Sequence, residues 1–431
     1  MGVGEQERAA ADGAVAPVRR YAALGGSWAA WLFDAVDAAV FSFVILAVSH
    51  AFGATLADVV SSVAWFLLAT GIGGYLLGYL ADRIGRRATL VVSVLTYATG
   101  TLMCGFADSV GELSMYRILV GIGVGGLWSA AVALVGETWP PHARTRAIAV
   151  LQTGWSGGTL LAAVLAWNVL DPADPSSWRR LFVVAAVPAY IIALVIAVTV
   201  RESPVWLESR RNRSAATASV SPMAIFAPAQ RRTTLRALGV SVLGMFGYWI
   251  IITFTPTYLQ SVLHVKVDQA PVFLVWTGVG ATLGYLLYGV LAERVGKRRA
   301  FIVFFTGIAI AVPLFALGVR LIPLTGGALA WTTGNVVLIG AMSALLGFFT
   351  GYFSGFGAWY AELFPTEIRS TAAGFCFNFG RVGAIAGIEL VPALVPVLGF
   401  TATYCVAAVT YLAAAGLVTT LRETGAADLA T

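Results

Sequence analysis

Long apolar runs alternate with short polar or glycine- and proline-bearing segments along almost the entire chain. Twelve such runs are centred near residues 36, 70, 97, 124, 157, 190, 247, 281, 310, 347, 382 and 409. Many are long enough to cross the ~30 Å hydrocarbon layer of a membrane as helices. They are continuously apolar, whereas the strands of a membrane barrel alternate between two faces. The pattern therefore predicts an all-α membrane protein with twelve transmembrane helices.

The longest polar stretch divides the predicted spans into two sets of six. It is rich in Arg, Ser and Ala and has too few apolar residues to form a core of its own. We therefore predict two six-helix bundles joined by a linker. The expected segments are an N-terminal tail at 1–21, a first bundle at 22–200, the linker at 201–235, a second bundle at 236–420 and a C-terminal tail at 421–431.

Short motifs recur in both predicted bundles and indicate an internal duplication. Residues 78–87 read Gly-Tyr-Leu-Ala-Asp-Arg-Ile-Gly-Arg-Arg, and residues 289–298 read Gly-Val-Leu-Ala-Glu-Arg-Val-Gly-Lys-Arg. Two further pairs match in the same order, 137–144 with 362–369 and 199–203 with 420–424. A duplicated membrane unit with a charged turn in each half is typical of transporters.

Composition excludes an ordinary soluble protein and predicts the orientation. Of the 431 residues, 59% are hydrophobic and 11% are charged, far fewer charged residues than in soluble domains. If the N-terminus is cytoplasmic, 21 of the 27 Lys and Arg residues fall in inner segments. The positive-inside rule then predicts cytoplasmic termini in a multi-pass protein of the plasma or bacterial inner membrane. Because these cations explain the net charge of +6, we expect no nucleic-acid partner.

The remaining residue types give no sign of cofactor, metal or enzyme chemistry. Cys104, Cys376 and Cys405 lie in apolar stretches without metal-ligand spacing, so we expect buried, reduced thiols. The sequence has no Gly-x-x-x-x-Gly-Lys-Ser/Thr segment that would bind ATP. We therefore expect a monomer that is not an enzyme and needs no cofactor.

Two motifs resemble those of the major facilitator superfamily of transporters. One is G-x-x-x-D-R-x-G-R-R at residues 78–87, and the other is the arginine followed by alternating glycines at 117–126. Segments 34–37, 202–207 and 375–384 are similar to proton symporters of sialate, lactate and aromatic acids, and to animal organic-anion transporters. The resemblance covers all twelve spans. It implies the major facilitator fold of two pseudo-symmetric bundles and proton-coupled transport of a small carboxylate across the lipid bilayer.

The first predicted span carries two acids, Asp34 and Asp37, near the membrane midplane. Their i, i+3 spacing places both on one helix face. Two carboxylates this close cannot both ionise at low cost in a low-dielectric site, so we expect one to take up a proton. The resemblance implies that Arg117 of the fourth span is the partner that Asp37 binds and releases. The alternatives are acids that pair without titrating and an arginine that merely ends a helix.

The eleventh predicted span carries Arg381 near the midplane, with no acid three or four residues away. An ionised side chain at this depth costs about 2.5 to 3.5 kcal/mol on insertion scales and needs a partner. A guanidinium suits bidentate binding of a carboxylate, so we expect Arg381 to bind substrate, with Asn378 one turn away. A permanent partner on another span is the alternative. Further candidates for the cavity wall, each of which could instead be a packing residue, are Gln152, Trp155, Tyr248, Trp249 and Tyr352.

The charged turns of the duplicated motif are expected to gate the cytoplasmic side. Gly78 and Gly85 allow close approach and a tight turn, and Asp82 can meet a helix N-terminus or an arginine of a neighbouring span. Anchoring by positive charge explains the arginines but neither the acid nor the glycines. The gate residues that we predict are Gly78, Asp82, Arg83, Gly85, Arg86, Glu137, Arg144, Gly289, Glu293, Arg294, Gly296, Glu362 and Arg369.

The sequence favours a secondary active transporter in which two bundles rock around a central site. The expected substrates are protons and a small organic anion, such as a monocarboxylate, a sialate or an aromatic acid. A transporter of a neutral sugar or an organic cation is the alternative in the same class. A membrane substrate sensor is the alternative of another class, although the linker and tails carry no evident partner motif.

Overall fold

The computed structural model describes residues 16–171, 173–212, 221–265, 271–325 and 328–424. Within these ranges, twelve helical segments are long and apolar enough to cross a membrane, and each predicted centre falls inside one of them. The predicted all-α membrane fold is therefore confirmed. Of the two predicted tails, residues 1–15 and 425–431 lie outside the described residues.

Ten of the twelve described spans are single helices, and the tenth and eleventh spans are interrupted. The first six are α2 (Pro17–Phe52), α3 (Leu56–Ile84), α4 (Arg86–Cys104), α5 (Val110–Thr138), α6 (Pro141–Val169) and α7 (Ser177–Thr199). The next three are α9 (Arg231–Leu263), α10 (Pro271–Val295) and α11 (Lys297–Arg320). The last three comprise α12 (Thr333–Phe349) with η3 (Thr350–Tyr352) and α13 (Phe353–Leu363), then α14 (Arg369–Phe379) with α15 (Arg381–Leu398), and finally α16 (Phe400–Val418).

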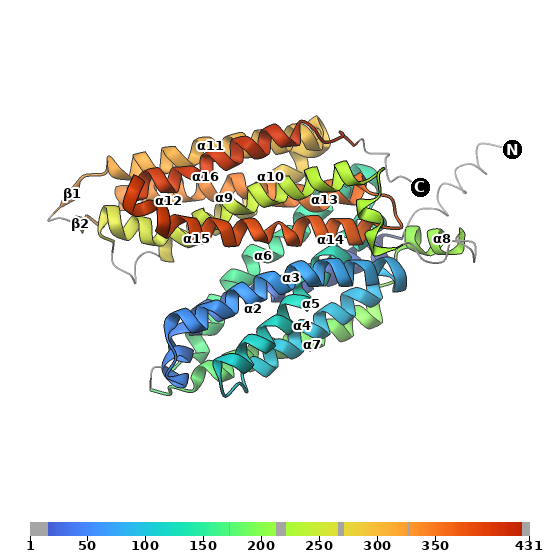
Figure 1. Ribbon diagram of the computed structural model, residues 1–431, viewed down its shortest axis with the longest axis horizontal. Helices are drawn as coiled ribbons and strands as arrows, with labels where there is room; N and C mark the ends of the chain where they lie inside the picture. The colour runs from blue at the N-terminus through green and yellow to red at the C-terminus, as the bar shows by residue number, and fades with distance from the viewer. Residues whose placement is uncertain (1–15, 172, 213–220, 266–270, 326–327, 425–431) are drawn as a thin grey trace.

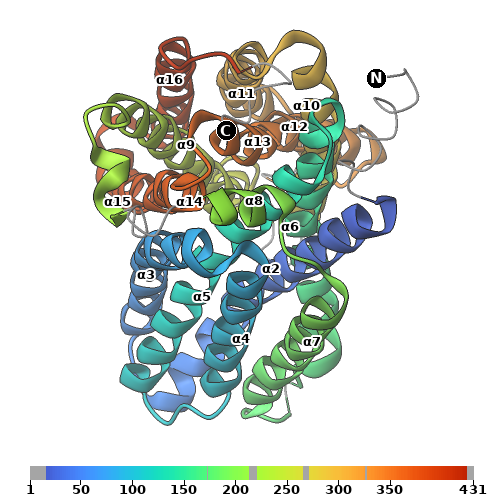
Figure 2. The same ribbon diagram turned by 90° about the vertical axis from the view of Figure 1, so that its right-hand side faces the viewer.

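The two halves of the chain form two bundles, which Figure 1 shows one above the other. Both run from the end that carries α8 (Pro204–Asn212), which we term the linker end, to the end that carries a short hairpin of β1 (Leu324–Thr325) and β2 (Ala328–Leu329), the hairpin end. The bundles converge at the linker end and diverge toward the hairpin end (Figure 1). Figure 2, seen from the linker end, shows α3 beside α14 and α6 beside α10. The molecule is therefore closed at its linker end.

The polar stretch between the bundles is more ordered than the sequence predicted. It contains α8 and the 3-10 helix η2 (Pro222–Phe226), and α9 already begins at Arg231. The indole of Trp206 in α8 is buried and donates a hydrogen bond to the carbonyl of Asp82 at 3.0 Å. The buried Trp206 thus docks this segment onto the first bundle. The polar composition of the segment as a whole does not predict this contact.

Glycine is required in the tight turns that follow α3 and α10. Gly85 has φ +111° and Gly296 has φ +91°, a backbone conformation that other L residues rarely adopt. A Cβ on either glycine would also collide with a carboxylate, that of Glu202 in the first turn and that of Glu423 in the second. These carboxylates accept backbone N–H bonds at the start of α4 and α11, at 2.9 and 3.0 Å. Both turns therefore have the tight geometry that the sequence predicted.

Replacing Gly78 with alanine is expected to destabilise the closed linker end. A Cβ on Gly78 of α3 would lie 2.6 Å from the carbonyl oxygen of Ser370 in the other bundle. Overpacking of this kind costs about 1–3 kcal/mol. Gly278→Ala is the matched control, because a Cβ there meets no atom of the described residues within 4 Å. Thermal unfolding in detergent should give a lower midpoint for Gly78→Ala than for Gly278→Ala. Equal midpoints would show that the close contact between Gly78 and Ser370 does not limit stability.

Candidate functional site

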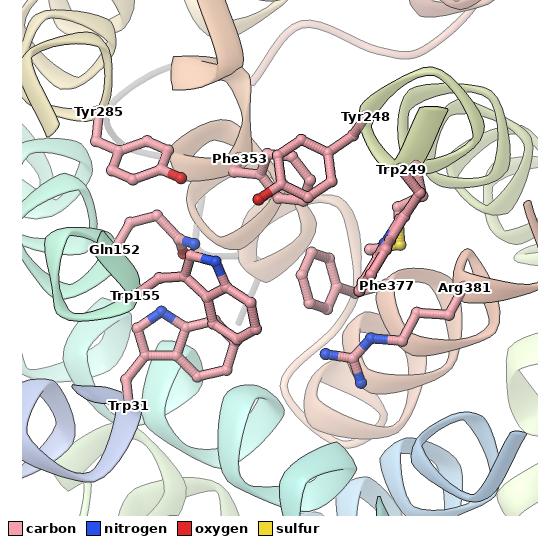
Figure 3. Close-up of a pocket in the computed structure, with 10 residues that line it drawn as sticks. Trp31, Gln152, Trp155, Tyr248, Trp249, Tyr285, Phe353, Phe377 and Arg381 are labelled. Carbon is pink, nitrogen blue, oxygen red and sulfur yellow. The ribbon is translucent and has the colours of Figure 1, made fainter. Parts of the chain in front are cut away.

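A pocket lies at the junction of the two bundles (Figure 3). Its lining side chains come from α2 and α6 of the first bundle and from α9, α10, α13, α14 and α15 of the second. The cavity that they enclose measures about 30 Å³ in this conformation, which is room for about one water molecule. The lining residues are Trp31, Gln152, Trp155, Met245, Tyr248, Trp249, Tyr285, Phe353, Phe377 and Arg381.

Aromatic rings dominate the wall of this pocket. Trp31 and Trp155 lie with ring centroids 5.3 Å apart, and Tyr248 meets Phe353 edge-on at 4.8 Å. The side chains of Gln152 and of the two lining tyrosines turn polar atoms toward the same space (Figure 3). Aromatic faces of this kind suit a flat ligand, and the polar atoms can offer it a few hydrogen bonds once the cavity widens.

Arg381 is the one cation among the described residues that line the pocket. It is the first residue of α15, directly after the break at Gly380, and its side chain is 7% exposed. Its guanidinium donates to the amide oxygen of Asn378 at 3.0 Å. The Asn378 amide nitrogen donates in turn to the carbonyl of Gly125, across the bundle interface, at 3.1 Å. Asn378 thus fixes the guanidinium and leaves further N–H groups available for an anion.

The two acids of α2 have different surroundings. Asp37 accepts hydrogen bonds from Arg117 of α5 at 2.9 Å and from the hydroxyl of Thr101 in α4 at 2.5 Å. Asp34 is fully buried, and neither of its carboxylate oxygens has a hydrogen-bond partner within the described chain. The charges of Arg381 and Arg117 both act on Asp34. One acid is therefore satisfied by an ion pair, and the other is buried without a hydrogen-bond partner among the described residues.

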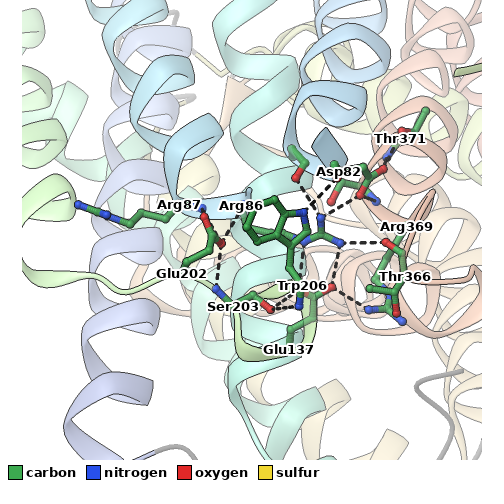
Figure 4. Close-up of polar contacts among 12 residues, drawn as sticks. Asp82, Arg86, Arg87, Glu137, Glu202, Ser203, Trp206, Thr366, Arg369 and Thr371 are labelled. Carbon is green, nitrogen blue, oxygen red and sulfur yellow. Dashed lines mark hydrogen bonds and ion pairs between the residues drawn. The ribbon is translucent and has the colours of Figure 1, made fainter. Parts of the chain in front are cut away.

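At the linker end, Glu137 of α5 is the centre of a buried ion-pair network (Figure 4). Its carboxylate accepts two hydrogen bonds from Arg86 of α4, each 3.1 Å long, and one from Arg369 of α14 at 2.7 Å. The hydroxyl of Ser203, just before α8, adds a bond of 2.5 Å. Because Arg369 belongs to the second bundle, this network joins the two halves of the molecule.

Asp82 makes the second connection between the bundles. Its carboxylate accepts the backbone N–H groups of Ser370 and Thr371 at 3.2 and 2.8 Å, and it pairs with Arg86 at 3.1 Å. The first two groups form the N-terminus of α14, where the helix dipole favours a negative charge. The aspartate of the charged motif thus meets both a helix N-terminus and an arginine, the two partners that the sequence suggested.

The second bundle repeats the Glu137 network with a longer contact across the interface. Glu362 forms an ion pair with Lys297 of its own bundle at 2.8 Å and accepts a hydrogen bond from the hydroxyl of Thr424, beyond the end of α16, at 2.6 Å. Its contact with Arg144 of the first bundle is 3.5 Å long. The equivalent contact of Glu137 with Arg369 is 2.7 Å. The two halves of the linker end are therefore similar in plan and unequal in strength.

The second charged turn also crosses to the other bundle. The carboxylate of Glu293 accepts the backbone N–H of Arg146 at 3.1 Å and pairs with its guanidinium at 2.5 Å. This pair is less protected than that of Asp82, because the Arg146 side chain is 53% exposed. Gly289 lies against the same helix, and a Cβ there would be 2.7 Å from that of Ala149.

Three residues that the sequence singled out lie outside these groups. The hydroxyl of Tyr352 bonds to the carbonyl of Gly244 at 3.1 Å, and the fully buried ring packs inside the second bundle. The prediction that Tyr352 lines the cavity is therefore wrong. Arg83 and Arg294 are exposed, and Arg83 lies over the ring of Tyr79 at 4.9 Å, so neither joins the network described above.

Sequence reasoning missed half of the pocket wall. Trp31 lies three residues before Asp34 on the same helix face, a spacing that could have identified it. No local signal distinguishes the others from packing residues, because apolar side chains occur on every face of a membrane helix. The missed residues are Trp31, Met245, Tyr285, Phe353 and Phe377.

Known proteins are similar to this chain over most of its length. A family model described as Major Facilitator Superfamily matches residues 27–321. A cis,cis-muconate transport protein of Acinetobacter baylyi is 30% identical over 362 residues, which cover 82% of this chain and 83% of that protein. A sialic acid transporter of Escherichia coli is 26% identical over 367 residues, which cover 84% of each chain.

The solved structure of a proton:xylose symporter, bound to 6-bromo-6-deoxy-D-glucose, superimposes with a TM-score of 0.77. The match covers 95% of this chain and 98% of that one at 20% identity, so it bears on the fold alone. The family match extends over more than half of the sequence and agrees with the twelve spans and the duplicated charged turns. The chain belongs to the major facilitator superfamily and is a membrane transporter rather than an enzyme.

Proposed function

We propose that this protein couples the transport of a small organic anion to protons by alternating access. The observation that carries the proposal is Arg381, a buried cation in an otherwise aromatic pocket between the bundles. A carboxylate bound there would provide an anionic partner and bidentate hydrogen bonds. A neutral sugar would give the guanidinium no directly bonded anion, and an organic cation would be repelled.

The pocket favours a flat, unsaturated acid over a polyhydroxylated one. Seven of its ten lining residues are aromatic, and aromatic faces prefer a planar partner. A ligand with many hydroxyl groups would need a hydrogen-bond partner for each of them. The relatives named above transport muconate and sialic acid, both organic acids, and the aromatic wall supports the planar type.

Proton coupling is supported by the buried acids of α2. Asp37 pairs with Arg117, and Asp34 has no hydrogen-bond partner within the part of the chain that the structure describes. Two neighbouring carboxylates in a low-dielectric site share protons as a coupled pair. We assign the transported proton to Asp37, whose protonation weakens its pairing with Arg117. Asp34 lies within reach of the charge of Arg381 and thereby links the proton site to the anion site.

The networks around Glu137 and Glu362 are proposed to form the cytoplasmic gate. The positive-inside rule assigns the linker end to the cytoplasm, so the described conformation is closed on that side. Release of substrate into the cell requires the cross-bundle contacts of Asp82, Glu137, Glu362 and Glu293 to break. These contacts are ionic and reversible, as a gate requires.

Neutralising Glu137 is expected to open the linker end. Glu137→Gln removes the anion that Arg369 pairs with and one of the two anions of Arg86, and breaking a buried pair costs about 3–5 kcal/mol. Opening can be followed by thiol labelling of Ser370→Cys, a position that is buried in the closed state. Labelling should be at least about tenfold faster with Glu137→Gln.

Two matched variants test whether the gate explains that result. Glu362→Gln should accelerate labelling less, because its contact with Arg144 is longer. Arg83→Gln should have no effect, because this side chain is exposed. If Glu137→Gln and Arg83→Gln were labelled at the same rate, the proposed gate would be wrong.

A transport assay tests the proposed function directly. Purified protein in proteoliposomes would be offered cis,cis-muconate, benzoate, lactate, sialic acid and xylose, with a pH-sensitive dye inside. We expect proton movement with the planar acids and none with xylose. Transport of xylose or of an organic cation, without transport of any acid, would replace this proposal with the alternative substrate class.

A further inference from the structure

The hydroxyl of Thr101 lies between two acceptors. Its oxygen is 2.5 Å from Asp37 Oδ1 and 2.9 Å from the carbonyl oxygen of Tyr97, one turn earlier in α4. A hydroxyl has one hydrogen and can donate to one acceptor at full strength, while its lone pairs can accept. Thr101 therefore has two hydrogen-bonding arrangements without any movement of its backbone.

We propose that Thr101 is a positioning residue that serves Asp37 in both of its protonation states. When Asp37 is ionised, Thr101 donates to its carboxylate. When Asp37 holds a proton, the hydroxyl rotates to donate to the Tyr97 carbonyl and accepts the new O–H of Asp37. The buried acid thus keeps a hydrogen-bond partner in each state, and no unpaired polar group is left in a site from which water is excluded.

The cation opposite Asp37 is held in place while the acid is neutral. The guanidinium of Arg117 lies between two rings, 4.6 Å from the centroid of Phe41 and 4.4 Å from that of Phe66. Each aromatic face attracts the cation, so Arg117 remains in position after its ion pair weakens. Thr101 thus gives Asp37 a hydrogen-bond partner, and the two rings hold Arg117, whether Asp37 is ionised or protonated.

Charged and titratable groups of several helices surround the Asp37 site. Arg117 faces Asp37 from α5, and Asp34 interacts with it from one turn earlier in α2. Tyr97 and Cys104 face it from α4, and Arg381 of α15 interacts with Asp34. Of these groups, Arg117 and Thr101 are the ones within hydrogen-bond distance of the Asp37 carboxylate in the described chain.

Thr101→Val tests the inference, which rests on the proposed proton coupling. Valine keeps the branched shape but removes the donor. A hydrogen bond to an ionised carboxylate is worth more than one to a neutral acid, so its loss favours the protonated form. The pH at which uptake is half-maximal should therefore move up by about one unit, and maximal uptake should fall. Thr101→Ser should restore the wild-type pH profile.

Thr277→Val is the matched control. Thr277 is also buried and donates to the carbonyl four residues earlier at 2.9 Å, but it lies in α10 and no hydrogen bond joins it to an acid among the described residues. Its replacement should leave the pH profile unchanged. If Thr101→Val does not fold, Thr101→Cys, a weaker donor, should shift the profile in the same direction by a smaller amount.

The outcomes distinguish a failure of the role of Thr101 from a failure of the proposed proton coupling. A wild-type pH profile in Thr101→Val or Thr101→Cys, with uphill uptake still dependent on Asp37, overturns the role of Thr101 and leaves proton coupling intact. An equal shift in Thr277→Val also overturns it, because the effect would then be a general one. Uphill uptake that survives Asp37→Asn removes the proposed function and this inference with it.

Discussion

Arg381→Ala is expected to lower the affinity for an organic anion by about 100-fold and to reduce uptake in parallel. The guanidinium would make charge-assisted hydrogen bonds to the carboxylate, worth about 1.5–3 kcal/mol each, and each 1.4 kcal/mol is a factor of ten in affinity. Alanine removes these bonds and the bond to Asn378. Binding can be measured by titration calorimetry and uptake in proteoliposomes, with the best planar acid found.

Arg381→Lys separates charge from geometry. Lysine keeps the positive charge but lacks the planar fork, so it cannot hold a carboxylate bidentately and also bond to Asn378 in the same way. We expect a loss of about tenfold, intermediate between wild type and alanine. Arg320→Ala is the control, because Arg320 is exposed at the end of α11. Unchanged affinity in both Arg381 variants would show that another group recognises the substrate.

The fold was predictable because it depends on average properties of long segments. Twelve apolar runs and a repeated charged turn are redundant signals, and an error of a few residues in one run does not change the number of spans. The cross-bundle partners of Asp82 and Glu137 were less predictable. Their position opposite α14 depends on how the bundles dock, which the repeated segments that contain both residues do not show.

The pocket was harder to predict because two of its walls follow helix breaks. Residues 350–352 form a 3-10 turn within the tenth span. Three residues at three per turn advance the helix phase by about 60° more than an α-helix does. The periodicity of a regular α-helix therefore does not predict which residues of this span face the pocket. Phe353 faces the pocket, whereas Tyr352 faces α9. The break at Gly380 similarly lies immediately before Arg381.

The contribution of the linker escaped prediction for a different reason. The linker docks through Glu202, Ser203 and Trp206, which bond to the start of α4, to Glu137 and to the carbonyl of Asp82, respectively. A few specific contacts do not change the amino-acid composition of a segment. A polar stretch that docks onto a bundle can therefore have the same composition as one that does not. The recurrence of Arg-Glu-Ser at 201–203 as Arg-Glu-Thr at 422–424 was the available signal.

Asp37→Asn is expected to abolish uphill accumulation while leaving exchange of substrate across the membrane. Asparagine has the shape of a protonated aspartate and can still bond to Thr101, but it carries no charge to hold Arg117 and no proton to release. The carrier would then cycle as though permanently protonated. Radiolabelled uptake against an imposed pH gradient measures the first process, and counterflow at equal pH measures the second.

Two further variants identify the acid that carries the proton. Asp108→Asn, an exposed acid at the hairpin end, should retain both activities. Asp34→Asn should retain gradient-driven uptake if Asp37 alone carries the proton, but with altered affinity, because the charge that acts on Arg381 is lost. If uphill uptake persisted in Asp37→Asn and disappeared in Asp34→Asn, Asp34 would be the acid that carries the transported proton. The ion pair with Arg117 would then be a structural contact, and the pocket itself would be the place where proton and anion meet.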